Sequence, residues 1–489
     1  MTLITLLWIA LPLFLGFSIA LFPQGDRPFT LMIAISSAAY GLTHILIPET
    51  TTLILTDHFG VTLMIDSLSG YFILTNALVT AAVVLYCWKD HLTQGSTAFF
   101  YTQLAILHGS INAVFVCADF ISLYVALEVI SIASFLLIAY PRTDKSIWVA
   151  LRYLLISNTA MLFYLIGTAL VYQASHSFAF EGLRQAPVEA IALIFLGLLA
   201  KGGIFISGLW LPLTHAESKT PVSAILSGIV IKTGVFPLVR CALLIEELTP
   251  VIQIFSVGTV LLGTAGAILK KDTKRTLAFS SISQMGFVLA APAIAGVYAL
   301  SHGLAKATLF LIAGSLPSRD FSELQKMRIS KSLWVAITIA SLSLCGFPLL
   351  AGFNAKSLVL ADLPIWLSTA LTIGSVGSAI AFAKFIFLPS DRASKSDTSS
   401  SSNLWPAVIL LLVSLLLLGI TNLESYTVKN IAKALITIAA GWLIYGLALR
   451  KNKQQFPQSL EKIEHLIGGM SIVLILLFWT VLQWQPSST

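Results

Sequence analysis

Charged residues are scarce in this chain of 489 residues. Only 10% of its residues are aspartate, glutamate, lysine or arginine, while 57% are hydrophobic and the mean hydropathy is +0.90. Soluble proteins carry about 25% charged residues, so this composition excludes a soluble globular protein. The N-terminal segment is apolar and lacks both a basic start and a small-residue cleavage site, which indicates a retained helix rather than a signal peptide. We therefore predict a polytopic membrane protein.

Cysteine is also rare, and its four residues are scattered without a CxxC motif or a paired spacing. Iron–sulfur clusters and structural zinc sites need clustered thiolates, so we interpret the four as apolar side chains within helices. The sequence also lacks a glycine-rich phosphate loop, a catalytic triad and a metal-ligand cluster. We expect no cofactor, metal site or catalytic residue in this chain. The four cysteines are Cys87, Cys117, Cys241 and Cys345.

The basic residues are unevenly distributed. Most of the 29 lysine and arginine residues, including those of the loop 270–275, fall in the odd-numbered loops between the predicted helices. The positive-inside rule makes these loops cytoplasmic and places the N-terminus on the non-cytoplasmic side. The net charge of +7 then reflects topology, and it does not indicate a nucleic-acid partner.

Apolar runs long enough to cross a bilayer dominate the chain. We predict an all-α polytopic membrane protein with about 14–16 transmembrane helices, and we interpret the polar segment 50–69 as a short external hairpin. Residues 450–465 are polar and are expected at the cytoplasmic surface. The predicted spans are roughly 3–22, 29–48, 70–88, 98–117, 120–140, 147–172, 190–208, 221–245, 250–269, 274–295, 298–316, 333–361, 364–388, 404–421, 429–449 and 466–484.

Two predicted spans are interrupted by glycine and proline. The first break follows Lys201, and the second precedes Lys356. Broken helices with an ionisable residue in matching places of two halves indicate an inverted-repeat transporter. We predict two inverted five-helix repeats, each containing a broken helix. The predicted parts are N-terminal helices 1–97, first half-channel 98–245, second half-channel 250–388, a serine-rich linker 389–403, and C-terminal helices 404–489.

Ionisable side chains within these spans are the strongest functional signal. A lysine exposed to lipid at a span centre costs about 2.5–3.5 kcal/mol, so these groups are expected to face protein, water or each other. None of the mid-span cations is arginine, and only lysine changes its charge readily when buried. This pattern favours proton transfer. The candidate relay residues are Glu128, Lys201, Lys232, His302, Lys306 and Lys356.

Some of these residues have plainer interpretations. Glu128 and Lys201 are expected to interact, either as a titrating pair or as a structural ion pair between helices. His302 and Lys306, four residues apart, share one helix face, yet a lone His302 is also compatible with a satisfied core histidine. Lys384, near a helix end, is expected to reach the surface.

Four ordered motifs resemble the antiporter-like subunits shared by respiratory complex I, photosynthetic NDH-1 and Mrp-type Na⁺/H⁺ antiporters. The resemblance covers about residues 60–390, and it implies a hydrophilic axis of one glutamate, a lysine on each broken helix and Lys/His groups between them. These positions match the six candidate residues. Leu213 departs from the family pattern, which has aspartate there, and 217–219 is more charged than usual. The motifs occupy residues 200–224, 226–235, 272–286 and 346–356.

The resemblance implies a proton-translocating subunit of a multisubunit monovalent cation (Na⁺)/H⁺ antiporter in an inner, plasma or thylakoid membrane. Its implied partners are other integral membrane subunits, protons, Na⁺ and lipid. Two alternatives stay open. One is a proton-pumping membrane-arm subunit of an NADH dehydrogenase, NDH-1-like or membrane hydrogenase complex, in which other chains carry the redox chemistry. The other is a non-conducting membrane scaffold. Helices near 152–155 and 227–232 look closer to Mrp sequences.

Overall fold

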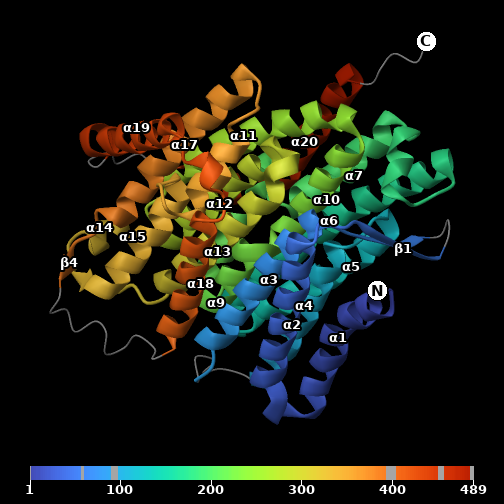
Figure 1. Cartoon of the computed structure of the whole chain (residues 1–489), viewed down its shortest axis with the longest axis horizontal. Coiled ribbons are helices and arrows are strands. Elements are labelled where there is room, and N and C mark those ends of the chain that lie inside the picture. Colours follow the sequence, from blue (N-terminus) through green and yellow to red (C-terminus); the bar gives the residue numbers. More distant parts are fainter. Residues whose placement is uncertain (1, 57–59, 90–96, 392–402, 450–455, 485–489) are drawn as a thin grey trace.

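The computed structural model describes residues 2–56, 60–89, 97–391, 403–449 and 456–484. These residues form an almost entirely helical bundle, which confirms the predicted fold class (Figure 1). Eleven of the described helices are long and apolar enough to cross a membrane, and three shorter apolar helices accompany them. Most of the predicted linker, and residues 450–455 of the predicted surface segment, lie outside the described residues.

Four helices and a hairpin come first along the chain. The hairpin strands pair antiparallel from Thr51 opposite Ile65 to Thr56 opposite Gly60, which confirms the predicted hairpin. Helix α1 packs on α4, and α2 packs on α3. The elements are α1 (Thr2–Leu21), α2 (Asp26–Leu46), β1 (Thr51–Thr56), β2 (Gly60–Ile65), α3 (Ser67–Tyr86) and α4 (Thr97–Val114).

The first predicted repeat continues with two complete spans, a broken span and a last span. Asp119 caps α5 by accepting a hydrogen bond from the Ser122 amide at 2.7 Å. The last span begins as α9, passes through a π-helical turn at Leu226–Val230 and ends as α10. The elements are α5 (Phe120–Ala139), α6 (Asp144–Ser175), α7 (Val188–Lys201), α8 (Leu211–Glu217), α9 (Thr220–Ile225) and α10 (Lys232–Leu244).

The second predicted repeat has the same kind of interruption between α15 and α16. Asp272 caps α12 by accepting a hydrogen bond from the Arg275 amide at 2.8 Å. Strand β3, before α15, pairs parallel with β4, which follows α17. The elements are α11 (Thr249–Leu269), α12 (Thr273–Ala290), α13 (Ala295–Ala313), α14 (Phe321–Leu324), β3 (Ile329–Ser330), α15 (Lys331–Cys345), α16 (Ala351–Val359), α17 (Ile365–Ile386) and β4 (Ser390–Asp391).

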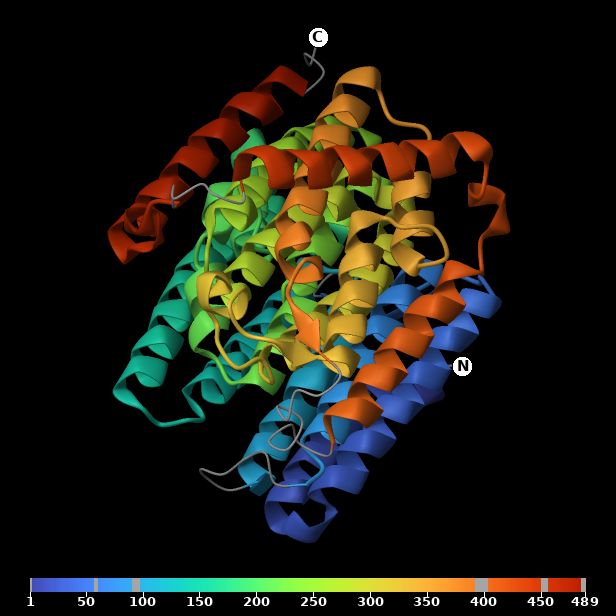
Figure 2. The same cartoon turned by 90° about the vertical axis from the view of Figure 1, so that its left-hand side faces the viewer.

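The three C-terminal helices lie on different faces of the bundle. Helix α18 (Leu404–Gly419) packs against α3, α13 and α16, whereas α19 (Val428–Ile444) packs on α17. Helix α20 (Ile463–Trp484) contacts α7 and the turn that follows it. Figure 2 shows α19 crossing the outer face of the bundle at a steep angle to α17.

The centre of the bundle is formed by the α9–α10 span, α12 and α13 (Figure 1). Residues 221–242 of the α9–α10 span are all buried, and so is all of α13 except Val297. These central helices carry lysine, histidine, serine and glutamine side chains. Ionisable groups at the centre therefore face protein rather than lipid, as membrane energetics requires.

Candidate functional site

The first break is produced by the sequence that follows Lys201. Gly203 has a φ of +67°, and a Cβ there would lie 2.1 Å from Leu211 Cδ1, so only glycine fits. A Cβ on Gly234 would lie 2.2 Å from the Gly202 nitrogen, so α10 approaches the break closely. The Trp210 indole nitrogen donates to the Ala200 carbonyl at 2.9 Å. This bond gives the Ala200 carbonyl a partner where the helix is interrupted. Backbone polar groups at membrane depth need such partners within the protein.

Lys201 ends α7 with only 3% of its surface exposed. Its ammonium donates to Ser157 Oγ at 2.7 Å and to Ser131 Oγ, and the two serine oxygens are 3.0 Å apart. Glu128 lies on α5, one turn before Ser131. Among the described ion pairs, none joins Glu128 to Lys201, and Glu128 Oε1 is buried without a hydrogen-bond partner in the described part of the chain. Glu128 and Lys201 therefore interact through space, as expected, but a serine pair rather than the carboxylate contacts the ammonium.

Lys232 follows the π-helical turn. The widened turn frees the carbonyls of Ser227 and Gly228, and the Lys232 ammonium donates to both, with 3.5 Å to the Ser227 oxygen. Ser227 Oγ also lies 2.7 Å from Ser281 Oγ on α12. A Cβ on Gly303 would lie 3.5 Å from the Lys232 nitrogen. Lys232 is therefore completely buried where its span meets α13, beside the residue that follows His302.

Lys306 lies one turn beyond His302 on α13 and is also completely buried. Its ammonium donates to the Leu277 carbonyl at 2.8 Å and to Ser280 Oγ, both on α12. Neither ring nitrogen of His302 has a partner among the described residues. A satisfied core histidine would have bonded both nitrogens, so that interpretation of His302 is not supported.

His302 and Lys356 meet at a cavity of about 10 Å³, which Gln284 and Tyr298 also line. This volume is close to the minimum that holds one water molecule. Tyr298 donates to Gln284 Oε1 at 2.6 Å, so polar groups surround the cavity. Lys356 is buried on α16 after the second break, where Gly346 takes a φ of +86°. The Lys356 nitrogen lies 3.4 Å from the Cys345 carbonyl and 5.2 Å from the Phe287 ring centre.

The structure thus forms two groups from the six predicted residues. Glu128 and Lys201 belong to α5 and α7, with serines of α5 and α6 around the ammonium. The other four residues, Lys232, His302, Lys306 and Lys356, gather around α12 and α13. Lys384 has a structural role, because it donates to the carbonyls of Ala267, Ile268 and Lys270 at 2.7–3.0 Å at the end of α11.

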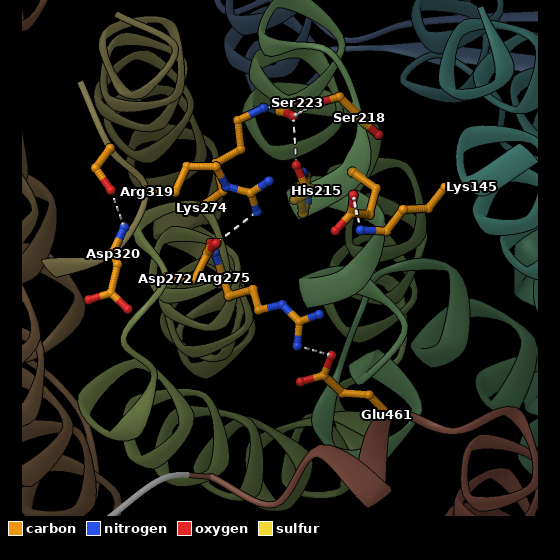
Figure 3. Close-up of polar contacts among 12 residues, drawn as sticks. Lys145, His215, Ser218, Ser223, Asp272, Lys274, Arg275, Arg319, Asp320 and Glu461 are labelled. Carbon is orange, nitrogen blue, oxygen red and sulfur yellow. Dashed lines mark hydrogen bonds and ion pairs between the residues drawn. The ribbon is translucent and has the colours of Figure 1, made fainter. Parts of the chain in front are cut away.

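A polar cluster at the basic end of the bundle was not singled out from the sequence. We define the basic end by Lys270, Lys274, Arg275 and Arg319, which lie in the connection before α12, in the first turn of α12 and in the segment before α14. Lys274, placed above in a cytoplasmic loop, is buried and donates to the Ser218 carbonyl at 2.8 Å (Figure 3). The buried His215 ring stacks on Phe310 at 5.0 Å, and neither of its nitrogens has a partner among the described residues.

His215 and Lys274 lie between the group around α12 and α13 and the basic end. Lys274 lies one turn before Leu277, whose carbonyl binds Lys306, and Phe310 lies one turn after Lys306. A signal existed in the sequence, because His215 stands between two prolines of the first break. Ion pairs surround the cluster: Lys145 with Glu217 at 2.9 Å, Arg319 with Asp272 at 2.8 Å and Arg275 with Glu461 at 3.0 Å (Figure 3).

Asp66 and Arg240 form an ion pair that ties α3 to α10. Arg240 donates to both carboxylate oxygens, one at 2.9 Å, and to Ser69 Oγ at 3.0 Å. Asp66 also caps α3 from outside the span. Burial raises the pKa of Asp66, but the hydrogen bonds and charge of Arg240 outweigh burial and lower the pKa below its ordinary value.

Comparison with known proteins relates this arrangement to one group. Residues 117–381 match the family model described as NADH:quinone oxidoreductase/Mrp antiporter, TM. The chain is 29% identical over 430 residues to NADH-quinone oxidoreductase subunit N of Desulforudis audaxviator, covering 78% of this chain and 85% of that protein. It is 28% identical over 331 residues to a Na⁺/H⁺ antiporter subunit of Alkalihalophilus pseudofirmus, covering 62% of this chain and 67% of that protein.

A cyanobacterial relative and two solved structures extend the comparison. NAD(P)H-quinone oxidoreductase chain 4 1 of Synechococcus elongatus is 31% identical over 324 residues, or 60% of each chain. The fold resembles a chain of the archaeal membrane-bound sulfane sulfur reductase, with a TM-score of 0.76, 20% identity and coverage of 91% and 99%. It also resembles a chain of the Mrp complex from Dietzia, with a TM-score of 0.74, 18% identity and coverage of 94% and 98%. At these identities the structural likeness concerns the fold alone.

Proposed function

We propose, from the premise that this chain belongs to the NADH:quinone oxidoreductase/Mrp antiporter transmembrane family, that it translocates protons as one subunit of a multisubunit membrane complex. The observation that carries this proposal is the row of lysine and histidine side chains buried in the central helices. Among the described ion pairs, none includes Lys201, Lys232, Lys306 or Lys356. Serine hydroxyls and backbone carbonyls contact them instead.

Such neutral partners suit a group that must change its charge. A carboxylate within an ion pair would hold each ammonium permanently charged, and removing the proton would leave an uncompensated buried anion. Serine and carbonyl oxygens accept a hydrogen bond from the ammonium without that penalty. Serine hydroxyls also donate, so the Ser131–Ser157 pair beside Lys201 can pass a proton on.

The proposed route uses the two groups in order. Protons enter near Glu128 and Lys201, pass Lys232 and the His302–Lys306 turn, and leave near Lys356. The water-sized cavity between His302 and Lys356 supports the last transfer. His302 suits the transfer because histidine titrates nearest physiological pH and neither of its nitrogens bonds to a described residue.

At the finer level, we propose that the complex is a Na⁺/H⁺ antiporter, with this chain carrying the protons. Similarity to the Na⁺/H⁺ antiporter chain of Alkalihalophilus pseudofirmus supports this assignment. A second candidate is a proton-pumping subunit of a quinone oxidoreductase complex, which is favoured by the longer match to the oxidoreductase chain of Desulforudis audaxviator. Partners identify which is correct: co-purification with small hydrophobic chains alone supports the antiporter, and co-purification with iron–sulfur proteins supports the redox complex.

A substitution at Lys201 tests proton transfer itself. Lys201→Met keeps a long unbranched side chain but removes the transferable proton, so the assembled complex is expected to lose proton transport in proteoliposomes. The matched control is Lys326→Met, which removes an exposed lysine of the basic end. Wild-type transport in the assembled Lys201→Met complex would contradict the proposal.

A further inference from the structure

A second, larger cavity lies beyond Lys356, between α16, α17 and α19. It has a volume of about 140 Å³, room for several water molecules or one small anion. Three lysines line it: Lys356 from the proposed relay, and Lys429 and Lys433 from α19. No carboxylate is among the described lining residues. The α17 residues that line the cavity, Thr372 and Ser375, lie in the first half of that helix, whose last turn contacts the basic end through Lys384.

The charge of this cavity is not balanced within the described part of the chain. Lys429 and Lys433 are four residues apart and therefore share one face of α19, where like charges repel. The described ion pairs include neither residue. The two acidic residues nearest in sequence to the lining segments, Glu424 and Asp362, are not among the cavity's lining residues. Three ammonium groups around one small space favour an anion between them.

The outer face of α19 indicates what carries that anion. Val428 is 85% exposed and Ile436 is 67% exposed, and Leu435, Leu443 and Ile444 are exposed as well. Figure 2 shows this helix on the outside of the bundle. The basic cavity therefore adjoins an exposed apolar surface. A phospholipid fits both features, with its phosphate in the cavity and its acyl chains along α19, as basic pockets between membrane helices bind anionic headgroups.

We propose that the cavity lined by Lys356, Lys429 and Lys433 binds a phosphate anion, supplied by the headgroup of an anionic phospholipid. Both α19 lysines lie outside residues 117–381, the part that matches the family model. The binding stands independently of transport. Its consequence rests on the proposed function: a phosphate beside Lys356 stabilises the charged form of the last relay residue, so the bound lipid regulates proton release.

The test measures lipid retention by the assembled complex. Complexes are purified, exchanged into phosphatidylglycerol or phosphatidylcholine, and examined by native mass spectrometry, with inorganic phosphate as a competing probe. The test variant is Lys429→Gln with Lys433→Gln. The control variant, Lys326→Gln with Lys331→Gln, removes two exposed lysines of the basic end. We expect the affinity of the test variant for phosphatidylglycerol to be about tenfold or more below that of the wild type. The control variant is expected to match the wild type.

Each outcome decides the proposal. Loss of one phosphatidylglycerol per chain in the test variant supports the lipid source. Binding of inorganic phosphate by the wild type in phosphatidylcholine, lost in the test variant, supports the same anion site with free phosphate as its occupant. Equal retention of phosphatidylglycerol by the wild type, the test variant and the control variant overturns the proposal. Loss of a partner subunit from the test variant, without loss of bound phosphatidylglycerol or phosphate, also overturns it. Lys201→Met should keep the lipid while losing transport, which separates this inference from the proposed function.

Discussion

At the residue scale, the choice of lysine is informative because lysine can give up its charge. Arginine cannot be deprotonated in proteins, and the row of buried cations at the centre consists of lysine. In the structure, the partners of these lysines are hydroxyls and carbonyls rather than carboxylates. The buried Arg240, by contrast, is paired with Asp66 and serves to join two helices.

Replacing Lys356 by arginine tests this distinction. Lys356→Arg keeps a positive charge, and the neighbouring cavity of about 140 Å³ accommodates the larger side chain. Because arginine holds its proton, we expect proton transport to fall about tenfold or more while assembly is unchanged. Transport is measured from acidification of proteoliposomes, with Lys433→Arg in the same cavity as control. Normal transport by Lys356→Arg would show that fixed charge suffices.

Two buried histidines differ in their hydrogen bonding, and the difference predicts opposite effects. His108 lies 2.9 Å from both Ser37 Oγ and Thr80 Oγ1, whereas both nitrogens of His302 lack partners among the described residues. His108→Ala should destabilise the protein by about 1–3 kcal/mol, because it removes two buried hydrogen bonds, to Ser37 and Thr80. His302→Gln should lower transport with little change in melting temperature. Thermal unfolding and transport are measured on both variants. Loss of transport alone in His108→Ala, with loss of stability alone in His302→Gln, would contradict these two roles.

At the element scale, the two breaks and the π-helical turn position the residues of the proposed relay. Apolar length predicted nearly every span, because a helix that crosses lipid must satisfy its own backbone. Proline and glycine predicted both breaks. The π-helical turn at Leu226–Val230 could not be predicted, since it depends on the close approach of Gly228 and Gly303 between helices. The serine pair beside Lys201 also arises only from packing of α5 against α6.

Close packing at the first break predicts a large effect from one methyl group. A Cβ on Gly234 would lie 2.2 Å from the Gly202 nitrogen, whereas a Cβ on Gly468 would meet nothing within 4 Å. Gly234→Ala should therefore displace the break and lower both melting temperature and transport. Gly468→Ala, in α20, should leave both unchanged or raise stability by up to about 1 kcal/mol. A tolerated Gly234→Ala would show that the break does not need this contact.

The Asp66–Arg240 pair predicts a pH dependence of stability. The pKa of Asp66 is lowered below its ordinary value of 3.8, because Arg240 outweighs the effect of burial. A lowered pKa stabilises the fold at pH values above the ordinary value, and the contribution is lost as the pH falls through the lowered pKa. Asp66→Asn should cost on the order of 2 kcal/mol at pH 7, and the difference should shrink as the pH falls below the ordinary pKa of 3.8.

Melting temperature against pH measures this effect. The control is Asp362→Asn, which changes an exposed carboxylate of the same type. A destabilisation by Asp66→Asn that is equal at all pH values would point to lost packing rather than to the ion pair.

At the scale of the whole molecule, four of the six residues of the proposed relay, far apart in the sequence, meet around α12 and α13. The six residues could be selected from the sequence because charge is so rare in the spans. Lys274 could not, because basic loops usually serve only as topology anchors, and the sequence signal for His215 is limited to the prolines on either side of it. Only the fold shows Lys274 buried beside Ser218 and the His215 ring stacked on Phe310.

The most direct measurement of the central claim is proton flux through the assembled complex when the middle of the row is removed. Lys306 is completely buried and bridges α13 to α12, so Lys306→Met removes a relay group without changing the protein surface. Complexes with wild-type Lys306, with Lys306→Met and with the control Lys326→Met are placed in proteoliposomes with an imposed driving force. Flux about tenfold or more below wild type in Lys306→Met, with the control unaffected, is the expected result. Undiminished flux through assembled Lys306→Met complexes would contradict a proton route along this row.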